Sequence, residues 1–101
     1  MEIVWLAWAR RDLESIAACY ESMASKEVAN SVLRRIVHCA SNLLDNPYLG
    51  HPSESTDGVH ELQVTRLPYL LPYRATLNRI EILRVFHEAQ DRPSEWQIIG
   101  E

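Results

Sequence analysis

Positive charge is scarce in this sequence of 101 residues. Ten lysines and arginines stand against fourteen aspartates and glutamates, Lys26 is the single lysine, and the formal net charge is -4. The balance is even along the chain, since residues 1–56 and residues 57–101 each hold five basic and seven acidic side chains. A protein that grips phosphate groups usually presents clustered lysine and arginine. We therefore expect no direct binding of nucleic acid.

Long apolar runs, glycine and proline are also few. No run approaches the roughly 20 residues of a membrane-spanning helix, and Met1-Glu2-Ile3 lacks the positive charge that opens a secretion signal. Three glycines, five prolines and a hydrophobic share of 47% are typical of a folded chain. We expect one domain over residues 1–101, in the cytoplasm and without membrane contact.

Only two cysteines are present, Cys19 and Cys39. In the helical hairpin predicted below they would be offset by about 12 Å along the helix axis, whereas a disulfide requires Cα atoms within about 7 Å. We expect two buried thiols. His38 and His51 have no neighbours at metal-ligand spacing, and we expect both to be exposed. The sequence therefore predicts no metal site and no cofactor.

The first half of the chain predicts a strand followed by two helices. Residues 3–8 are β-branched and aromatic, as in a buried strand. From Leu13 onward apolar side chains recur at helical spacing, and Asp12 near the start complements the helix dipole. Ser25 is a suitable N-cap for a second helix through residues 28–44. This helix is apolar over more than one face, which indicates contact with the first helix and a sheet, or with a partner chain.

The second half predicts three antiparallel strands. Residues 59–65 alternate between apolar and polar side chains, the period of a strand with one buried face. Residues 70–76 form the next strand, in which Pro72 cannot donate a hydrogen bond and so predicts a bulge or an unpaired amide. Together with the helices, this order predicts an α+β fold in which an N-terminal strand and a helical hairpin pack on a small antiparallel sheet.

The stretch from Ile80 to Phe86 is predicted to be the central strand. It carries apolar side chains on both faces, with Ile82 and Phe86 on one and Leu83 and Val85 on the other. The tail that follows holds three large apolar side chains that are unfavourable when left in water: Trp96, Ile98 and Ile99.

A two-residue loop at Leu77-Asn78 fixes the register of the hairpin. Position 74 then lies opposite position 81, so that Arg74 and Glu81 form an ion pair across the strands, and Tyr73 packs on Ile82 in the neighbouring pair. Asn78 is the loop residue best able to adopt a positive φ.

Three segments resemble toxins of the RelE/ParE superfamily. They are Gly58-Val59-His60-Glu61-Leu62, Leu71-Pro72-Tyr73-Arg74, and the stretch from Arg79 to Pro93. Many relatives have arginine at the position of His60. The resemblance extends over most of the chain and implies the same α+β fold, and with it the toxin component of a type II toxin–antitoxin system.

The superfamily contains two functional classes. Members similar to RelE or YoeB cleave mRNA on the ribosome, which requires a base, an acid and cations at the phosphate. Here the resemblance implies Glu61 or His60 as base, His87 as acid, and Arg74 and Arg84 as phosphate clamps. In an unbroken strand, however, Arg84 would point to one face and His87, with Arg74 and Glu81, to the other.

Members similar to ParE inhibit DNA gyrase by protein–protein binding. Such a toxin needs no acid, base or basic groove, so the acidic charge balance and the scarcity of lysine favour this class. The resemblance also implies a cognate antitoxin similar to ParD, forming a hetero-oligomer with the toxin. A chain that binds only its antitoxin and has lost toxicity is a further alternative. The apolar candidates for antitoxin contact are Trp8, Leu13, Tyr20, Leu33 and Val37.

Overall fold

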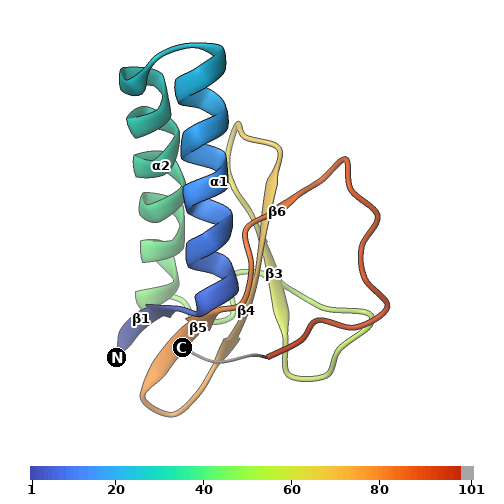
Figure 1. Cartoon of the computed structure of the whole chain (residues 1–101). Coiled ribbons are helices and arrows are strands. Elements are labelled where there is room, and N and C mark those ends of the chain that lie inside the picture. Colours follow the sequence, from blue (N-terminus) through green and yellow to red (C-terminus); the bar gives the residue numbers. More distant parts are fainter. Residues whose placement is uncertain (99–101) are drawn as a thin grey trace.

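The computed structural model describes residues 1–98, and its architecture confirms the α+β prediction. A hairpin of two helices covers one face of a six-stranded sheet (Figure 1). The helical elements are α1 (Ala7–Met23), α2 (Lys26–Ser41) and the short 3-10 helix η1 (Asn42–Leu44). The strands are β1 (Glu2–Trp5), β2 (His51–Pro52), β3 (His60–Gln63), β4 (Tyr69–Ala75), β5 (Arg79–Ile82) and β6 (Phe86–His87).

The sheet has the order β1-β5-β4-β3-β2, and β6 pairs with β4 beyond the end of β5. The pairs among β2 to β6 are antiparallel as expected. β1 joins β5 in parallel, which makes the sheet mixed. The segment that begins at Ile80 was predicted to be the central strand, but the middle strand of the sheet is β4, its hairpin partner. β5 lies between β1 and β4.

The first strand is shorter than residues 3–8. It ends at Trp5, because Leu6 donates its N–H to Ile82 and its carbonyl already accepts from Arg10 in the first turn of α1. The helix thus begins at Ala7, and its first turn holds no acidic side chain. Asp12 therefore lies too far along α1 to act on the helix dipole as predicted, since that effect is confined to the first turn.

The start of α2 is as predicted from sequence. The hydroxyl of Ser25 accepts a hydrogen bond from Val28 N at 3.1 Å, and Glu27 lies in the first turn. Its buried residues face α1 and the sheet. Cys39 is among them, whereas Cys19 is exposed on α1 with its thiol directed at the Met23 sulfur, so the expectation of a second buried thiol was wrong. The next residue along α1, Tyr20, packs against the core, whereas Cys19 lies on the exposed side of the helix.

The hairpin register is confirmed. Arg74 pairs with Glu81 and Tyr73 with Ile82, and Thr76 N donates to Arg79 O at 2.8 Å to close the Leu77-Asn78 loop. The loop forms without a positive φ at Asn78. Among the described non-glycine residues, a positive φ occurs at Arg66, in the turn between β3 and β4.

Pro72 disrupts the strand opposite to it. Along β4, the backbone N–H and C=O groups of even-numbered residues point toward β5 and β6. The N–H that proline lacks at position 72 would therefore have paired on that side. Leu83 N donates to Pro72 O at 2.8 Å, but no N–H is available in return. The register then shifts by one residue, from Tyr73 opposite Ile82 to Leu70 opposite Phe86. The disruption predicted at Pro72 is thus a bulge over residues 83–85.

This bulge corrects the predicted faces of the strand. One extra residue reverses the alternation of side chains, so Phe86 joins Leu83 on the face away from the helices. Val85 lies instead with Ile82 in the core between helices and sheet.

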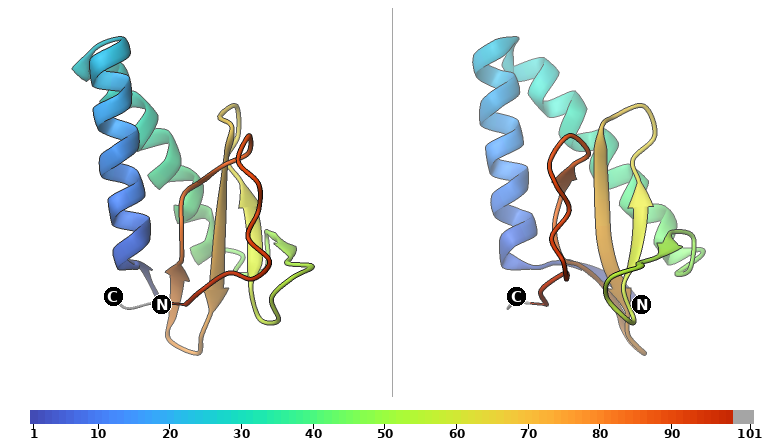
Figure 2. Two further views of the ribbon diagram at one scale, coloured as in Figure 1. Left: turned by 45° about the vertical axis from the view of Figure 1, so that its right-hand side comes forward. Right: turned by 90° about the vertical axis from the view of Figure 1, so that its right-hand side faces the viewer.

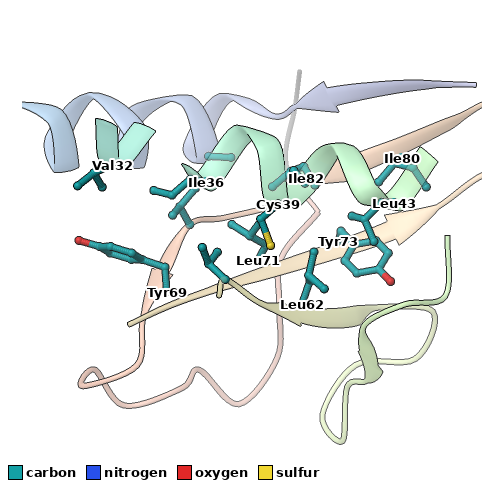
Figure 3. Packing of buried hydrophobic residues seen from close by; sticks show 14 residues of the cluster. Val32, Ile36, Cys39, Leu43, Leu62, Tyr69, Leu71, Tyr73, Ile80 and Ile82 are labelled. Carbon is teal, nitrogen blue, oxygen red and sulfur yellow. The ribbon is translucent and has the colours of Figure 1, made fainter. Parts of the chain in front are cut away.

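Two apolar clusters lie on the two faces of the sheet. The larger one joins α1 and α2 to the strands (Figure 3); its labelled members are Val32, Ile36, Cys39, Leu43, Leu62, Tyr69, Leu71, Tyr73, Ile80 and Ile82. The smaller one, on the opposite face, includes Trp96 of the C-terminal segment. Trp96 is thus buried, Ile98 is 41% exposed, and Ile99 lies outside the described residues.

Candidate functional site

Asp12 joins α1 to the bulge. Its carboxylate accepts hydrogen bonds from Arg84 Nε at 2.7 Å and Nη2 at 3.0 Å, and from the backbone N–H of Val85 at 2.9 Å. These hydrogen bonds raise the pKa of Arg84 above its ordinary value. The guanidinium also lies 5.4 Å from the centroid of the Trp8 ring. The charge of Arg84 is therefore already engaged by this chain.

His87 lies at the end of β6, half-buried. Its Nδ1 accepts a hydrogen bond from Ala89 N at 3.0 Å, and its ring lies nearly perpendicular to the Tyr69 ring, with centroids 5.3 Å apart. Burial raises the pKa of Tyr69, so the phenol next to His87 stays protonated. His87 also lines an open hollow beside α1, together with Asp12 and Cys19.

Arg74 lies on the other face of the sheet. Its guanidinium pairs with Glu81, which also binds Arg79. Glu81 is only 3% exposed. Burial by itself would raise the pKa of this carboxyl, but the hydrogen bonds from both arginines outweigh burial and hold the pKa below its ordinary value. Glu81 is thus a structural carboxylate between two cations.

Glu61 and His60 are held by different neighbours. Glu61 Oε2 accepts from the indole N–H of Trp96 at 2.7 Å, and Oε1 lies 3.2 Å from Arg92 Nη1. The His60 ring lies between Tyr48 and Tyr73, with centroid distances of 5.5 and 5.7 Å. Neither residue lies next to His87, because β4 separates β3 from β6.

The residues proposed for mRNA cleavage therefore divide into two groups. Arg84 and His87 both border α1 near Asp12, contrary to the opposite faces expected of an unbroken strand, because the bulge re-aims them. Arg74 and Glu61 lie on the face away from the helices, with Glu81 and Trp96. The fold does not bring these four side chains around one phosphate-sized site.

The five apolar candidates for partner contact occupy different environments. Leu13 and Tyr20 pack against the main core, and Trp8 lies beside Arg84. Leu33 and Val37 line an open hollow of about 550 Å³ on α2, and Val37 is 46% exposed. Arg34, His38 and Ser41 complete its lining.

The sequence did not identify the partners in two long-range contacts. Asp12 reaches Arg84 across 72 positions, and no local pattern marks such a pair. The contact of Glu61 with Trp96 spans 35 positions, although an otherwise exposed tryptophan in a polar tail was a signal that something covers it.

Residues 1–98 contain no feature of a metal site or a membrane-spanning helix. No cluster of three or more His, Cys, Asp and Glu side chains suited to a metal ion occurs there. Within the same residues, no helix combines the length and apolar character required to cross a membrane.

Comparison with known proteins gives a family and a structural relative. The family model of the ParE toxin of type II toxin–antitoxin systems (parDE) matches residues 3–92. A solved structure described as the chromosomal ParDE toxin–antitoxin system from P. aeruginosa is similar, with 31% sequence identity and a TM-score of 0.77. The alignment covers 86% of this chain and 95% of that one. No curated protein sequence gives a significant match.

Proposed function

This chain belongs to the ParE toxins of type II toxin–antitoxin systems, and from that premise we propose that it inhibits DNA gyrase by protein–protein binding and is neutralised by a cognate antitoxin. Inhibition by surface recognition requires neither a general acid nor a phosphate-binding groove. The net charge of -4 is compatible with such a mode of action.

One observation carries the choice of gyrase over mRNA: the two arginines that would clamp a phosphate are each paired within the chain. Arg84 is bidentate on Asp12, and Arg74 pairs with the buried Glu81 on the other sheet face. A phosphate would have to compete with Asp12 for Arg84 and with Glu81 for Arg74, and loss of Arg74 would leave the buried Glu81 with Arg79 as its remaining cation. The pairing therefore favours a structural role for both arginines.

The hollow on α2 is the surface that we propose for antitoxin contact. Leu33 and Val37 are one helical turn apart and present apolar surface beyond the buried face of α2. Arg34 and His38 flank them on the same helix, and a partner segment with aliphatic and acidic side chains would complement this surface. Trp8, Leu13 and Tyr20 would contribute from α1 where their exposed edges permit.

The target is tested with the purified protein and purified gyrase. We expect inhibition of DNA supercoiling that depends on toxin concentration, and no cleavage of mRNA on translating ribosomes. In cells, expression of the chain alone should produce filamentation and an SOS response. Ribosome-dependent cleavage of mRNA with unaffected supercoiling would contradict the proposal.

The antitoxin surface is tested with the product of the adjacent upstream reading frame as the partner. Val37→Glu should weaken the complex by about tenfold or more, because it buries a charge opposite an apolar anchor. Leu77→Glu is the matched control, since Leu77 is 92% exposed in the β4–β5 loop. Equal effects of the two variants would exclude α2 as the contact surface.

A further inference from the structure

The loop of residues 53–59, between β2 and β3, lies at the opposite end of the molecule from the turn between α1 and α2 (Figures 1 and 2, yellow-green). Ser53 N donates to Val59 O at 2.8 Å and closes the loop, and Val59 N donates to Thr56 O at 3.3 Å within it. Asp57 and Gly58 are thus the two central residues of a β-turn. The φ of +79° at Gly58 is typical of the third position of a type II turn. Both residues are exposed.

The Asp57 carboxylate and the Gly58 N–H are adjacent along the chain, and neither is engaged. Among residues 1–98, neither group has a hydrogen-bond or ion-pair partner. A carboxyl carbon and the nitrogen of the next residue can close a five-membered ring. Open space surrounds Gly58, with nothing beyond its chain neighbours within 4 Å of a Cβ built there. No side chain therefore obstructs the approach of these two groups.

The other described aspartates differ from Asp57 in these respects. Asp12 uses its carboxylate to hold the bulge. The N–H that follows Asp45 already donates to Asn42 O at 3.2 Å. Asp91 is exposed, but an arginine follows it. Asp57 is therefore the one described aspartate with a free carboxylate, a free neighbouring N–H and no side chain on the next residue.

We propose that Asp57 is a site of spontaneous covalent modification, at which the aspartate isomerises to isoaspartate. The Gly58 nitrogen attacks Cγ of the protonated Asp57 carboxyl, a C–N bond forms, and the amide hydrogen and the carboxyl hydroxyl leave as water. The resulting succinimide then takes up one water. Addition at Cγ restores aspartate, whereas addition at the main-chain carbonyl breaks the original bond to the Gly58 nitrogen and leaves the chain connected through Cβ and Cγ. Water is the only co-reactant.

The turn offers little resistance to ring closure, which requires rotation of the peptide unit between Asp57 and Gly58. The hydrogen bond that spans the turn, from Val59 N to Thr56 O, is 3.3 Å long, beyond the usual range of about 2.7–3.2 Å. Glycine also accepts a wide range of φ. The rotation therefore displaces no packed side chain and breaks at most one long hydrogen bond.

Isoaspartate would add one main-chain carbon to a turn whose flanking residues are anchored. Thr56 Oγ1 accepts a hydrogen bond from Trp96 N at 2.8 Å, and Val59 is only 1% exposed. A longer chain between Thr56 and Val59 displaces one or both of them. We therefore expect the modified protein to unfold at a lower temperature than the unmodified protein. This inference does not depend on the identity of the toxin's target.

Incubation of the full chain at growth temperature and mildly acidic pH tests the proposal. Isoaspartate is measured by the transfer of a labelled methyl group from S-adenosylmethionine by protein isoaspartate methyltransferase, and electron-transfer fragmentation of peptides locates it. We expect isoaspartate to accumulate at position 57, with far less at Asp45 or Asp91. The modified fraction, separated by ion-exchange chromatography, should have a lower thermal midpoint, and an unchanged midpoint would contradict the expected displacement of Thr56 and Val59.

Three variants and a peptide make the outcome decisive. Asp57→Glu retains the charge but would require a six-membered ring, so the product should be lost. Gly58→Asn adds a Cβ while tolerating the positive φ, and most of the product should again be lost. Asp91→Glu is the matched control and should leave the yield at position 57 unchanged.

A synthetic peptide of residues 51–62 gives the rate of the reaction without the fold. If the peptide forms isoaspartate while the folded protein forms none at position 57, the turn protects Asp57 and the proposal fails. An equal total yield of isoaspartate in Asp57→Glu and the unaltered protein would also overturn it, because the reaction would then take place elsewhere in the chain.

Discussion

Asp12 binds Arg84 through two hydrogen bonds, at 2.7 and 3.0 Å, and thereby connects the first helix to a bulge 72 positions later in the chain. The same carboxylate accepts the Val85 N–H, which the bulge withholds from the sheet. One side chain thus satisfies a cation and a backbone donor that would otherwise lack an acceptor at the helix–sheet boundary. Arg84, which the resemblance implies as a phosphate clamp, here helps to join the helix to the sheet.

Replacement of Asp12 by alanine should lower the free energy of unfolding by about 1–3 kcal/mol, because Arg84 and Val85 N–H lose their acceptor. Asp12→Asn should cost less, since its amide oxygen can still accept one of these bonds. Urea denaturation measures both. Glu14→Ala, exposed on the same helix, is the control and should change stability by less than about 0.5 kcal/mol. A loss of the same size at Glu14 would show that removal of any carboxylate from α1, rather than loss of this contact, is responsible.

Local chemistry explains which features could be predicted from the sequence. The β4–β5 register follows from the loop length and from the alternation of side chains, both of which are local. The Ser25 cap is local as well. Pro72 predicted a disruption of the sheet, because the missing N–H donor is a property of that one residue. Which strand absorbs that disruption depends on the partner, so the bulge at residues 83–85 and the changed face of Phe86 could not be derived.

The bulge at residues 83–85 also decides where the candidate site residues lie. Arg84 and His87 were assigned to opposite faces by strict alternation, and the one extra residue of the bulge places both beside α1. Arg74 stayed on the face predicted for it, with Glu81. Contacts such as Asp12 with Arg84 and Glu61 with Trp96 join distant segments, and a single sequence holds no pattern that pairs them.

The ion pair of Arg74 with Glu81 should contribute modestly to stability. Arg74→Ala should lower the unfolding free energy by about 0.2–1 kcal/mol, the range for cross-strand pairs. Part of the effect is buffered because Arg79 still binds Glu81. Chemical denaturation of Arg74→Ala, Glu81→Gln and the double variant gives the coupling between the two residues. Arg35→Ala, exposed on α2, is a suitable control. A coupling near zero would mean that the pair is incidental.

Glu81 should make stability depend on acidity. Its folded pKa lies below the ordinary 4.5, so ionised Glu81 stabilises the fold at neutral pH. That contribution is fully present above the unfolded pKa and is lost as the pH falls from about 4.5 through the lower folded pKa. Urea midpoints measured from pH 7 to pH 3 should fall more steeply for the unaltered protein than for Glu81→Gln. Parallel curves for the two proteins would contradict this assignment.

Gly50 should not tolerate a side chain. A Cβ at this position would lie 2.8 Å from the backbone oxygen of Glu61 and 2.8 Å from Cε1 of Tyr73. The Gly50 N–H also donates to the Tyr73 hydroxyl at 3.0 Å, which limits any shift of the backbone. Gly50→Ala should therefore destabilise the protein by about 1–3 kcal/mol. Thermal unfolding monitored by circular dichroism measures the change.

Gly58 provides the comparison, because open space surrounds it and its φ is +79°. Asparagine tolerates this backbone region, so Gly58→Asn should cost less than about 1 kcal/mol. If Gly50→Ala were as stable as Gly58→Asn, close packing would not be the reason for glycine at position 50.

His87→Ala separates the two toxin classes most directly. The His87 ring contacts Tyr69 and its Nδ1 accepts from Ala89 N, so truncation removes one hydrogen bond and one edge contact at the periphery of the fold. If the toxin acts on gyrase by surface binding, inhibition of supercoiling should be retained by a variant whose thermal unfolding is still cooperative. If His87 were the general acid of a ribonuclease, cleavage of mRNA would fall by about 100-fold or more. His38→Ala, at an exposed position of α2, controls for the loss of an imidazole away from this site. Loss of supercoiling inhibition in His87→Ala but not in His38→Ala would instead place the gyrase contact at the β6 end of the sheet.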